Sequence, residues 1–480
     1  MRRYFYRVLA VLIVGSLIFM GGCGKKSTKS EIDKEGAVEK VKQANAALAD
    51  ELYTLISTEL DSVERPEDID FSSANRLYKE ALGLDPDNLD ANFGAGLTEI
   101  LIVTLDPDVN AVFDKWDRYL DTASFFQPKT AIYSEKGFAK KIAQPGFPTG
   151  KKDFIIPSNF LLSSIFGVFY TGLTNPPQIH EVQDLIDSKL LPKVDYALVR
   201  LKKVASNPGY TFIITPKMQG DPEEDSLELD LTEIYLIITG LDLSKALCNI
   251  ATSYNFDFPS YDSAGLAQVI PQNSDFLSLR PGGATKLASA KAAFLDACDN
   301  LEDAIHFLRN ETDNQNNDVI KIGPDDVTNK DLDSVLAYIP RVRNTLEISE
   351  DVTADFDDDG FDETVAFAAG AFFDNPIQNL KRDLLPGYTT RVERDSSGWC
   401  YSYYWNGYEW ICEWFYVDRY FWVPILIWNA NSFDQWVFPN PSFNSILPEI
   451  TTDQMFKQTF GIDASDWDKE TRIEIFDSWD

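Results

Sequence analysis

Residues 74–86 of the chain read ANRLYKEALGLDP, and residues 91–96 read ANFGAG. Alanines lie four residues before Tyr78 and three residues after it, so one helix face would carry a large ring between two small side chains. Pro86 stops that helix, because a proline ring cannot continue it. Gly96 then offers a small residue where a second helix would approach closely. The stretch predicts two helices joined by a short turn.

The pattern A-x3-Y-x2-A-x4-P in this stretch resembles the second helix of a tetratricopeptide repeat, and ANFGAG resembles the first helix of the next repeat. The resemblance covers only about 30–45 residues. Pro66 interrupts the upstream half, and Asp106-Pro107 ends the next unit. A generic helical hairpin is the alternative.

Apolar residues repeat at helical spacing in further segments, at 37–60, 180–205, 231–251 and 284–309. We expect the second of these to break or kink at Pro192. The predicted fold class is α+β and predominantly α-helical, with strands concentrated after about residue 360. The expected parts are a tetratricopeptide-like helical region at 37–125, a central helical domain at 126–345 and a smaller, aromatic, β-rich C-terminal unit at 346–480.

Acidic residues outnumber basic ones, with 76 Asp and Glu against 43 Lys and Arg and a formal net charge of −33. Such a surface repels polyanions and attracts cations and basic partners, so we exclude nucleic-acid binding. A hydrophobic content of 44% suffices for large cores and argues against wholesale disorder.

The N-terminus combines three arginines with an apolar run at 8–20 that is too short to span a bilayer comfortably. The run ends in Met20-Gly21-Gly22-Cys23, which resembles the lipobox of bacterial lipoproteins. The resemblance implies that residues 1–22 are a signal peptide and that Cys23 carries fatty acyl chains such as palmitate. Residues 23–36 would then form a polar tether. An ordinary cleaved leader and an uncleaved anchor are the alternatives.

Two or three acyl chains hold a protein stably on a membrane, whereas one chain holds it marginally. Gly24, rather than Asp, follows Cys23. In that family this implies the outer membrane as the address in a two-membrane bacterium. We therefore expect a lipid-anchored protein of the cell envelope, where disulfides can persist.

Residues 355–363 read DFDDDGFDE, and the window from 344 to 380 holds no Lys or Arg. The segment resembles the DxDxDG calcium loops of EF-hands, dockerins and FG-GAP repeats. The EF-hand version needs a Glu at 366, which is Ala here, and Thr364-Val365 favours the variant that runs into a strand. We expect Ca²⁺ to be the cofactor, with a solvated acidic turn as the alternative. The expected ligands are the side chains of Asp355, Asp357, Asp359 and Glu363 and the backbone carbonyl of Phe361.

Seven of the ten tryptophans lie between 399 and 436, and an Asn-Gly pair at 406–407 between aromatic runs is a hairpin signal. A three-residue loop would set Cys400 opposite Cys412, whereas a two-residue turn would leave them out of register. Opposed strand residues can lie within the Cα separation that a disulfide tolerates. We therefore predict the three-residue loop and a Cys400–Cys412 bridge.

Trp405, Tyr408 and Trp410 are candidate ligand-binding aromatics, because their flat, amphipathic rings can stack on sugars. Burial against the helices is the alternative, since aromatic residues are common in strands. Cys248 and Cys298 lie on apolar helical stripes and are expected to face a core. A bridge between those two cysteines stays open.

Catalytic motifs are missing from the sequence. The chain has only two histidines, His180 and His306, and no GxSxG, phosphate-loop or GxGxxG motif. We expect a non-catalytic binding or scaffold protein that contacts the membrane through its lipid and also binds a protein partner. A surface glycan-binding lipoprotein is the first alternative. A carboxylate-dependent glycoside hydrolase is the second, because such an enzyme needs only two acids near a cleft.

Overall fold

The computed structural model describes residues 33–57, 70–124, 178–257, 274–354, 362–384, 388–405 and 410–424 and short pieces between 427 and 479, except 222, 313–314 and 324–326. The chain forms two compact units, both discontinuous in sequence. The first comprises Met1–Lys115, Glu181–Ser253 and Pro281–Glu347. The second comprises Trp116–His180, Tyr254–Arg280 and Ile348–Asp480.

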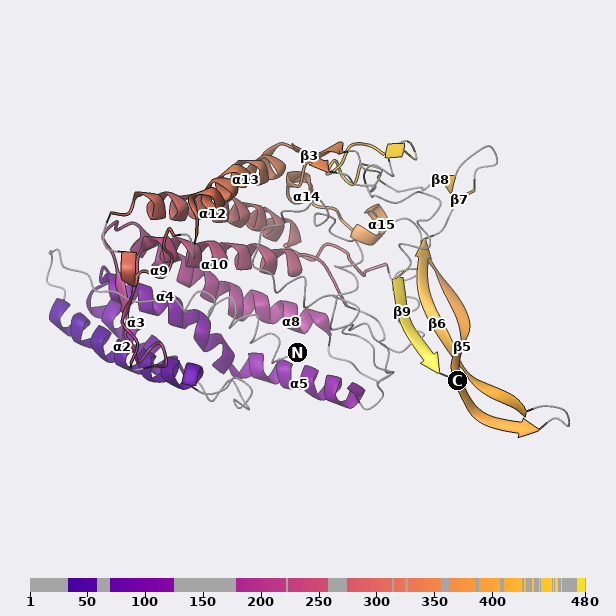
Figure 1. Ribbon diagram of the computed structural model, residues 1–480, viewed down its shortest axis with the longest axis horizontal. Coiled ribbons are helices and arrows are strands. Elements are labelled where there is room, and N and C mark those ends of the chain that lie inside the picture. Colours follow the sequence, from indigo (N-terminus) through magenta and orange to yellow (C-terminus); the bar gives the residue numbers. More distant parts are fainter. Residues whose placement is uncertain are drawn as a thin grey trace. The chain divides into compact units, whose positions relative to one another are not determined.

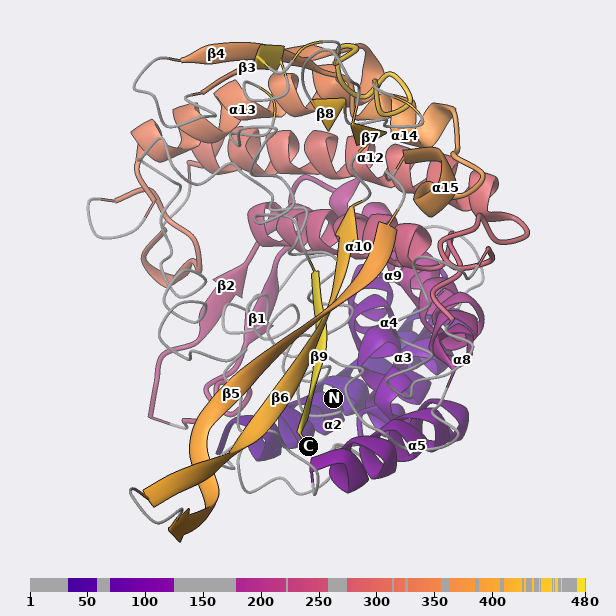
Figure 2. The same ribbon diagram turned by 90° about the vertical axis from the view of Figure 1, so that its right-hand side faces the viewer.

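The first unit contains a row of helices in which each helix packs on the next. The row consists of α2 (Lys34–Ser57), α3 (Ser72–Leu84), α4 (Leu89–Leu101), α9 (Leu191–Ala205), α10 (Leu231–Ala251), α12 (Gly283–Asn310) and α13 (Asn329–Glu347). Consecutive members contact one another, and α2 also contacts α4. Figure 1 and Figure 2 show this succession from α2 to α13. Contacts in this row therefore run mainly between neighbouring helices.

The predicted helices on either side of Pro86 are confirmed. α3 ends at Leu84 and α4 begins at Leu89, so Pro86 lies in the turn between them. The side chain of Asn88 caps α4 by accepting a hydrogen bond from the N–H of Ala91 at 2.9 Å. The close approach at Gly96 is also confirmed, because a Cβ there would lie 3.2 Å from Leu201 Cγ in α9.

Buried side chains from α2, α3, α4, α9 and α10 form one core, which also takes in the hairpin β1 (Phe212–Ile214) and β2 (Leu227–Leu229). The ring of Phe93 lies 4.7 Å from that of Phe212 and so ties α4 to β1. Residues from both of the regions expected at 37–125 and 126–345 contribute to this core. The β1–β2 hairpin was not predicted, because each strand has only three residues.

The break or kink predicted at Pro192 takes the form of a π-helical segment just before it, and the helix is not broken there. α8 (Ile179–Leu185) continues through a π-helical segment, η3 (Ile186–Leu190), into α9. Pro192 stands in the first turn of α9, directly after this segment, where its missing N–H interrupts the regular ladder of helical hydrogen bonds. α10 has its predicted bounds, and α12 extends one residue beyond the predicted helix at each end.

A second, smaller core joins α12 to α13. It is formed by Ile305 and Leu308 of α12 with Leu332 and Ile339 of α13. The short 3-10 helix η4 (Gln315–Asn317) lies between the two helices in sequence. Two further elements follow α4, namely η2 (Ile102–Leu105) and α5 (Pro107–Ser124).

The second unit contains the longer strands. β3 (Glu350–Ala354) pairs with β4 (Glu363–Phe367), and β7 (Ile427–Trp428) pairs with β8 (Asp434–Gln435). β5 (Tyr388–Trp405), β6 (Trp410–Pro424) and β9 (Ile473–Trp479) form an antiparallel sheet in that order. Two short helices, α14 (Gly370–Asp374) and α15 (Leu380–Leu384), lie between β4 and β5. The predominantly helical α+β fold is thus confirmed.

The register of the aromatic hairpin differs from the prediction. Cys400 of β5 lies opposite Trp414 of β6, and Cys412 lies opposite Tyr403. The connection from 405 to 410 spans four residues instead of three, and the register shifts on both sides of Cys400. The longer connection moves the cysteines out of alignment, because the regular pairing outward from Trp405 and Trp410 sets Cys412 opposite Tyr403. The predicted three-residue loop is therefore wrong.

The new register also removes the geometric basis of the Cys400–Cys412 bridge. The partner of Cys412 lies three residues from Cys400 along β5. Three strand residues span about 10 Å, whereas a disulfide needs Cα atoms less than about 7 Å apart. The side chains of both cysteines lie outside the described residues.

Candidate functional site

Several predicted site residues lie outside the part of the chain that the structure describes. These are the lipidation residue Cys23, the calcium ligands Asp355, Asp357, Asp359 and Phe361, and Tyr408. The fifth calcium ligand, Glu363, is the first residue of β4 and lies opposite Ala354 at the end of β3. The predicted loop therefore connects two antiparallel strands, and the strand expected at Thr364-Val365 is confirmed.

The candidate aromatics lie at the end of the β5–β6 hairpin. Trp405 and Trp410 are partners in the register on either side of the connection. β9 pairs only with Val417–Trp422 of β6, so the described residues before Val417 pair with β5 alone. The aromatic end of the hairpin is thus a two-stranded ribbon. The side chains of Trp405 and Trp410 lie outside the described residues.

Cys248 in α10 and Cys298 in α12 are both free thiols. Burial raises the pKa of Cys248 to about 11 and, with smaller effects from neighbouring charges, also raises the pKa of Cys298. Cys298 packs against the core between α12 and α13. This packing agrees with the expectation that the cysteines behave as small apolar side chains.

Three carboxylates gather at the start of α10. Asp230, Glu311 and Asp318 each place an oxygen within 4.8 Å of the others. Asp230 and Asp318 are buried, and Glu311 is half-buried and accepts a hydrogen bond from Gln315 Nε2 at 3.0 Å. Carboxylates this close repel one another unless protons or a cation balance their charge. The sequence did not reveal this group, because its members are far apart along the chain.

A fourth acid, Glu233, adjoins the group. Glu233 and Asp230 form a capping box, in which Glu233 accepts the Asp230 N–H at 3.1 Å, and Glu233 also accepts the Ile320 N–H at 3.1 Å. Burial first, and the charge of Asp230 second, raise the pKa of Glu233 well above its usual range. The Glu233 carboxyl therefore holds its proton more tightly than an ordinary carboxyl group does.

An open pocket of about 300 Å³ lies beside Glu311. It is lined by Pro208, Phe307, Asn310, Glu311 and Thr312. Only one of these residues is acidic, and the nearby Asp230 and Asp318 are buried. A glycosidase needs two carboxyl groups that both reach the sugar, and this pocket offers one.

The second cluster of polar contacts is the α9 seam, where α3, α4 and α9 meet. We define it as Lys79, Asn92, Glu99, Lys193, Tyr196, Arg200 and Lys203. Glu99 of α4 is 7% exposed and forms ion pairs with Lys79 of α3 and with Lys193 of α9, the latter at 3.0 Å. Asn75 also donates to Glu99, at 3.1 Å. Burial alone would raise the pKa of Glu99, but the two lysines and Asn75 outweigh it and lower the pKa.

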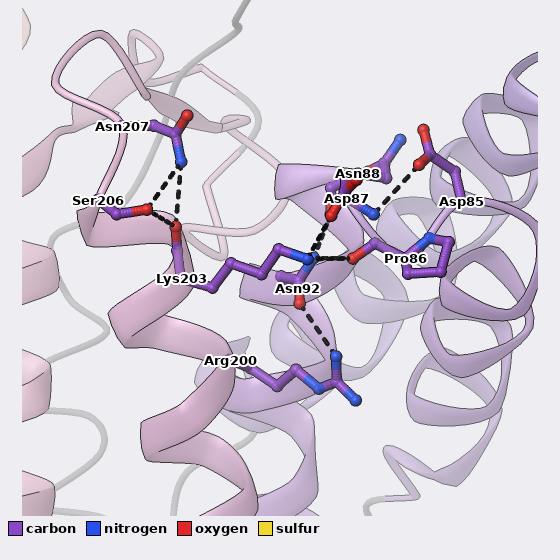
Figure 3. Close-up of polar contacts among 9 residues, drawn as sticks. All are labelled: Asp85, Pro86, Asp87, Asn88, Asn92, Arg200, Lys203, Ser206 and Asn207. Atoms are coloured by element: carbon purple, nitrogen blue, oxygen red, sulfur yellow. Dashed lines mark hydrogen bonds and ion pairs between the residues drawn. The ribbon is translucent and has the colours of Figure 1, made fainter. Parts of the chain in front are cut away.

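The other end of the seam fastens α9 to the turn between α3 and α4 (Figure 3). Lys203 donates to the carbonyl of Pro86 at 2.7 Å and to Asp87 at 2.6 Å. Asn92 of α4 accepts a hydrogen bond from Arg200 Nη1 at 3.3 Å and donates to the carbonyl of Pro86 at 3.0 Å. These bonds hold the turn that ends α3 against the last turns of α9.

Tyr196 lies between the two ends of the seam. The Nζ atom of Lys79 lies 5.2 Å from the centre of its ring, and Cζ of Arg200 lies 4.8 Å from it. Both cations are within the range of cation–π attraction. The spacing of Lys193, Tyr196, Arg200 and Lys203 along α9 is a helical stripe that the sequence contains, but their partners on α3 and α4 lie about a hundred residues away.

α10 is long and apolar enough to cross a membrane by length and composition. In the structure it packs between α9 and α12 and contributes Ile234, Ile237 and Ile238 to the first core. It has the contacts of a core helix.

No family model matches the chain, and neither the curated proteins nor the solved structures provide a match to it.

Proposed function

We propose that the chain is a lipid-anchored, non-catalytic binding or scaffold protein of the bacterial cell envelope. The anchor is Cys23, placed after the lipobox-like Met20-Gly21-Gly22. The predicted tether is shorter than expected, because α2 begins at Lys34. Residues 23–33 act as the tether between the membrane and the helical row. In a two-membrane bacterium the address is the outer membrane.

The observation that carries the proposal is the row from α2 to α13, in which each helix packs on the next. Arrays of this kind present extended surfaces to partners, and their chemistry lies in recognition. The described residues add the largely buried Lys193–Glu99 ion pair, the exposed Lys203–Asp87 ion pair and capping contacts within the row. These contacts fix the helices relative to one another, as a binding surface requires.

We propose Ca²⁺ as a structural cofactor of the second unit, bound between β3 and β4. The pairing of Ala354 with Glu363 supports this site, because it brings the two ends of the Asp-rich loop together. A loop closed in this way can direct alternate carboxylates and the Phe361 carbonyl to one point. The ion would then hold the connection of this β-hairpin.

Glycan binding is the second candidate function. The two-stranded end of the β5–β6 hairpin favours it, since no third described strand covers the segment from 410 to 416. Trp405, Tyr408 and Trp410 lie at or beside this end in sequence. A ribbon of this kind is stable only marginally without further contacts, and a glycan or a protein would supply them.

Crosslinking in cells tests the function. Wild-type protein that carries a crosslinking label should yield defined crosslinked products with envelope proteins. These products should disappear when the same protein without the label is supplied in excess. A glycan array with the same protein tests the second candidate function. Glycan binding predicts that wild type binds glycans on the array and that Trp410→Ala removes this binding. Crosslinking that is diffuse and not competed, with no glycan bound, would contradict both functions.

A further inference from the structure

α9 is basic in a chain that is strongly acidic. Its 15 residues contain Lys193, Arg200, Lys202 and Lys203 against a single acid, Asp195. The whole chain carries −33. A local concentration of positive charge in such a protein marks a place where the surface would attract an anion.

Most of the cations on α9 have a carboxylate partner. Lys193 pairs with Glu99, Lys203 pairs with Asp87, and Lys202 pairs with Asp242 and Asp296. Arg200 differs from all three. Among the described residues its guanidinium donates only to the neutral amide of Asn92 and stacks on Tyr196.

The environment of Arg200 leaves its hydrogen-bonding capacity unused. The Nε atom is buried and has no acceptor among the described residues. Arg is protonated at every physiological pH and presents several donors in one plane. A half-buried guanidinium without a counter-charge is unfavourable. The buried Nε is out of reach of a ligand, so an acceptor from outside would bind at the two Nη atoms, of which Nη1 also donates to Asn92.

A second excess cation lies on the same aromatic ring. Lys79 and Lys193 share the single carboxylate of Glu99, and Lys79 also approaches Tyr196 at 5.2 Å. Around Tyr196 three cations are therefore balanced by one anion. The part of the α9 seam around Tyr196 has a net positive charge of two by these contacts.

We infer that the α9 seam binds an acidic segment of a protein partner, with a carboxylate of that segment on the planar fork of Arg200. The inference rests on the proposed binding function and names the chemistry of its partner. A carboxylate matches the fork in shape and can accept two parallel hydrogen bonds. Lys79 supplies a second positive charge, and the ring of Tyr196 offers an apolar flank.

The charge of the whole protein argues for a short acidic segment over a larger polyanion. Nucleic acids and anionic membranes bring many negative charges close to a chain of −33, and long-range repulsion opposes them. A short segment brings few charges and meets the local field of α9 at close range. Inorganic phosphate and anionic vesicles are therefore the comparison ligands.

The test measures binding of a fluorescent Glu-rich peptide to the full chain purified in detergent, with the matching Gln-rich peptide as reference. Wild type should bind the Glu peptide, more weakly as salt rises, and should ignore the Gln peptide. Arg200→Gln should weaken binding at least tenfold, and Arg200→Lys should weaken it less, because the charge remains and the fork is lost. Lys79→Gln, which leaves Lys193 on Glu99, should cause a several-fold loss.

Arg76→Gln is the matched control, because Arg76 is on α3, is 61% exposed and pairs with Glu80 outside the seam. Its affinity for the Glu peptide should equal that of wild type. The inference would be overturned if Arg200→Gln and Lys79→Gln bound the Glu peptide as tightly as wild type does. It would also be overturned if wild type did not bind the Glu peptide. The choice of an acidic protein segment as the partner would be overturned if inorganic phosphate or phosphatidylglycerol vesicles bound in an Arg200-dependent way and the Glu peptide did not bind.

The same variant separates this inference from the proposed function. Arg200→Gln should lose the crosslinked partner in cells while remaining in the membrane fraction. If the variant keeps every crosslinked product, the seam is not the binding site but the scaffold function stands. If wild type gives no specific product, the proposed function itself fails.

Discussion

Tyr78 of α3 packs directly on the backbone of Gly94 in α4, so closely that a Cβ at Gly94 would clash with the Cζ and Cε atoms of the tyrosine ring. Tyr78 is completely buried, and its hydroxyl donates to Asn45 of α2 at 2.5 Å. One side chain therefore links three consecutive helices of the row. The missing side chain at Gly94 makes that link possible.

Gly94→Ala should destabilise the first unit, because the added methyl group forces Tyr78 out of its position. Overpacking of a close core contact costs about 1–3 kcal/mol. Gly240→Ala in α10 is the matched control, since a Cβ there meets nothing within 4 Å. It should stabilise the helix by up to about 1 kcal/mol. Urea unfolding measures the free energy of unfolding of both variants. A Gly94→Ala protein as stable as wild type would contradict the close packing of Tyr78 on Gly94.

Glu99→Gln should also destabilise the first unit at neutral pH. The change leaves Lys79 and Lys193 without their shared carboxylate, at a cost of about 2 kcal/mol. Because the folded state lowers the pKa of Glu99, its contribution is complete above the unfolded pKa and disappears as the pH falls through the folded value. Urea midpoints from pH 7 to pH 3 should converge for wild type and variant; a constant difference would contradict this linkage.

Asp242 should show the opposite pH dependence. This carboxylate of α10 is 1% exposed, 3.4 Å from Lys202, and accepts from Asn300 at 3.1 Å. Burial raises its pKa to about 6. The folded state then binds the proton more tightly than the unfolded state, so stability from this group rises as the pH falls from 7 towards 4.

Asp242→Asn should therefore raise stability at pH 7, by about 1 kcal/mol at most, and should remove that rise towards acid pH. Asp296→Asn is the control, because Asp296 binds the same lysine but is 53% exposed. Its unfolding midpoint should stay close to that of wild type. A pH profile of Asp242→Asn parallel to that of wild type would show that Asp242 titrates normally.

The helices around Pro86 could be predicted because their signals are local: spacing of apolar residues, a proline and a small glycine. The bounds of α10 followed from periodicity alone for the same reason. The burial of Glu99 could not be predicted, since its lysine partner on α9 is 94 residues away. The prediction of the hairpin register failed because the connection spans four residues, from 406 to 409, and the Asn-Gly signal alone does not set that length.

The calcium site predicts a ligand-dependent change in stability. Ca²⁺ that binds only the folded state raises stability by about 2.7 kcal/mol at a hundredfold excess over Kd. Chelation should therefore lower the melting temperature of the full chain, and Asp357→Ala should remove most of that difference. Differential scanning calorimetry with calcium and with chelator measures both. Wild-type melting that ignores millimolar calcium would mean that the loop is a solvated acidic turn.

Fractionation of cells that express wild type or Cys23→Ala tests the central claim, the lipid anchor of a scaffold protein, most directly. Wild type should be found in the membrane fraction as a mature form that metabolic labelling with palmitate marks. Cys23→Ala should incorporate no palmitate and should lose membrane attachment, because acyl chains on this thiol are the proposed anchor. A Cys23→Ala protein that has lost its leader and still remains entirely in the membrane fraction would contradict the account.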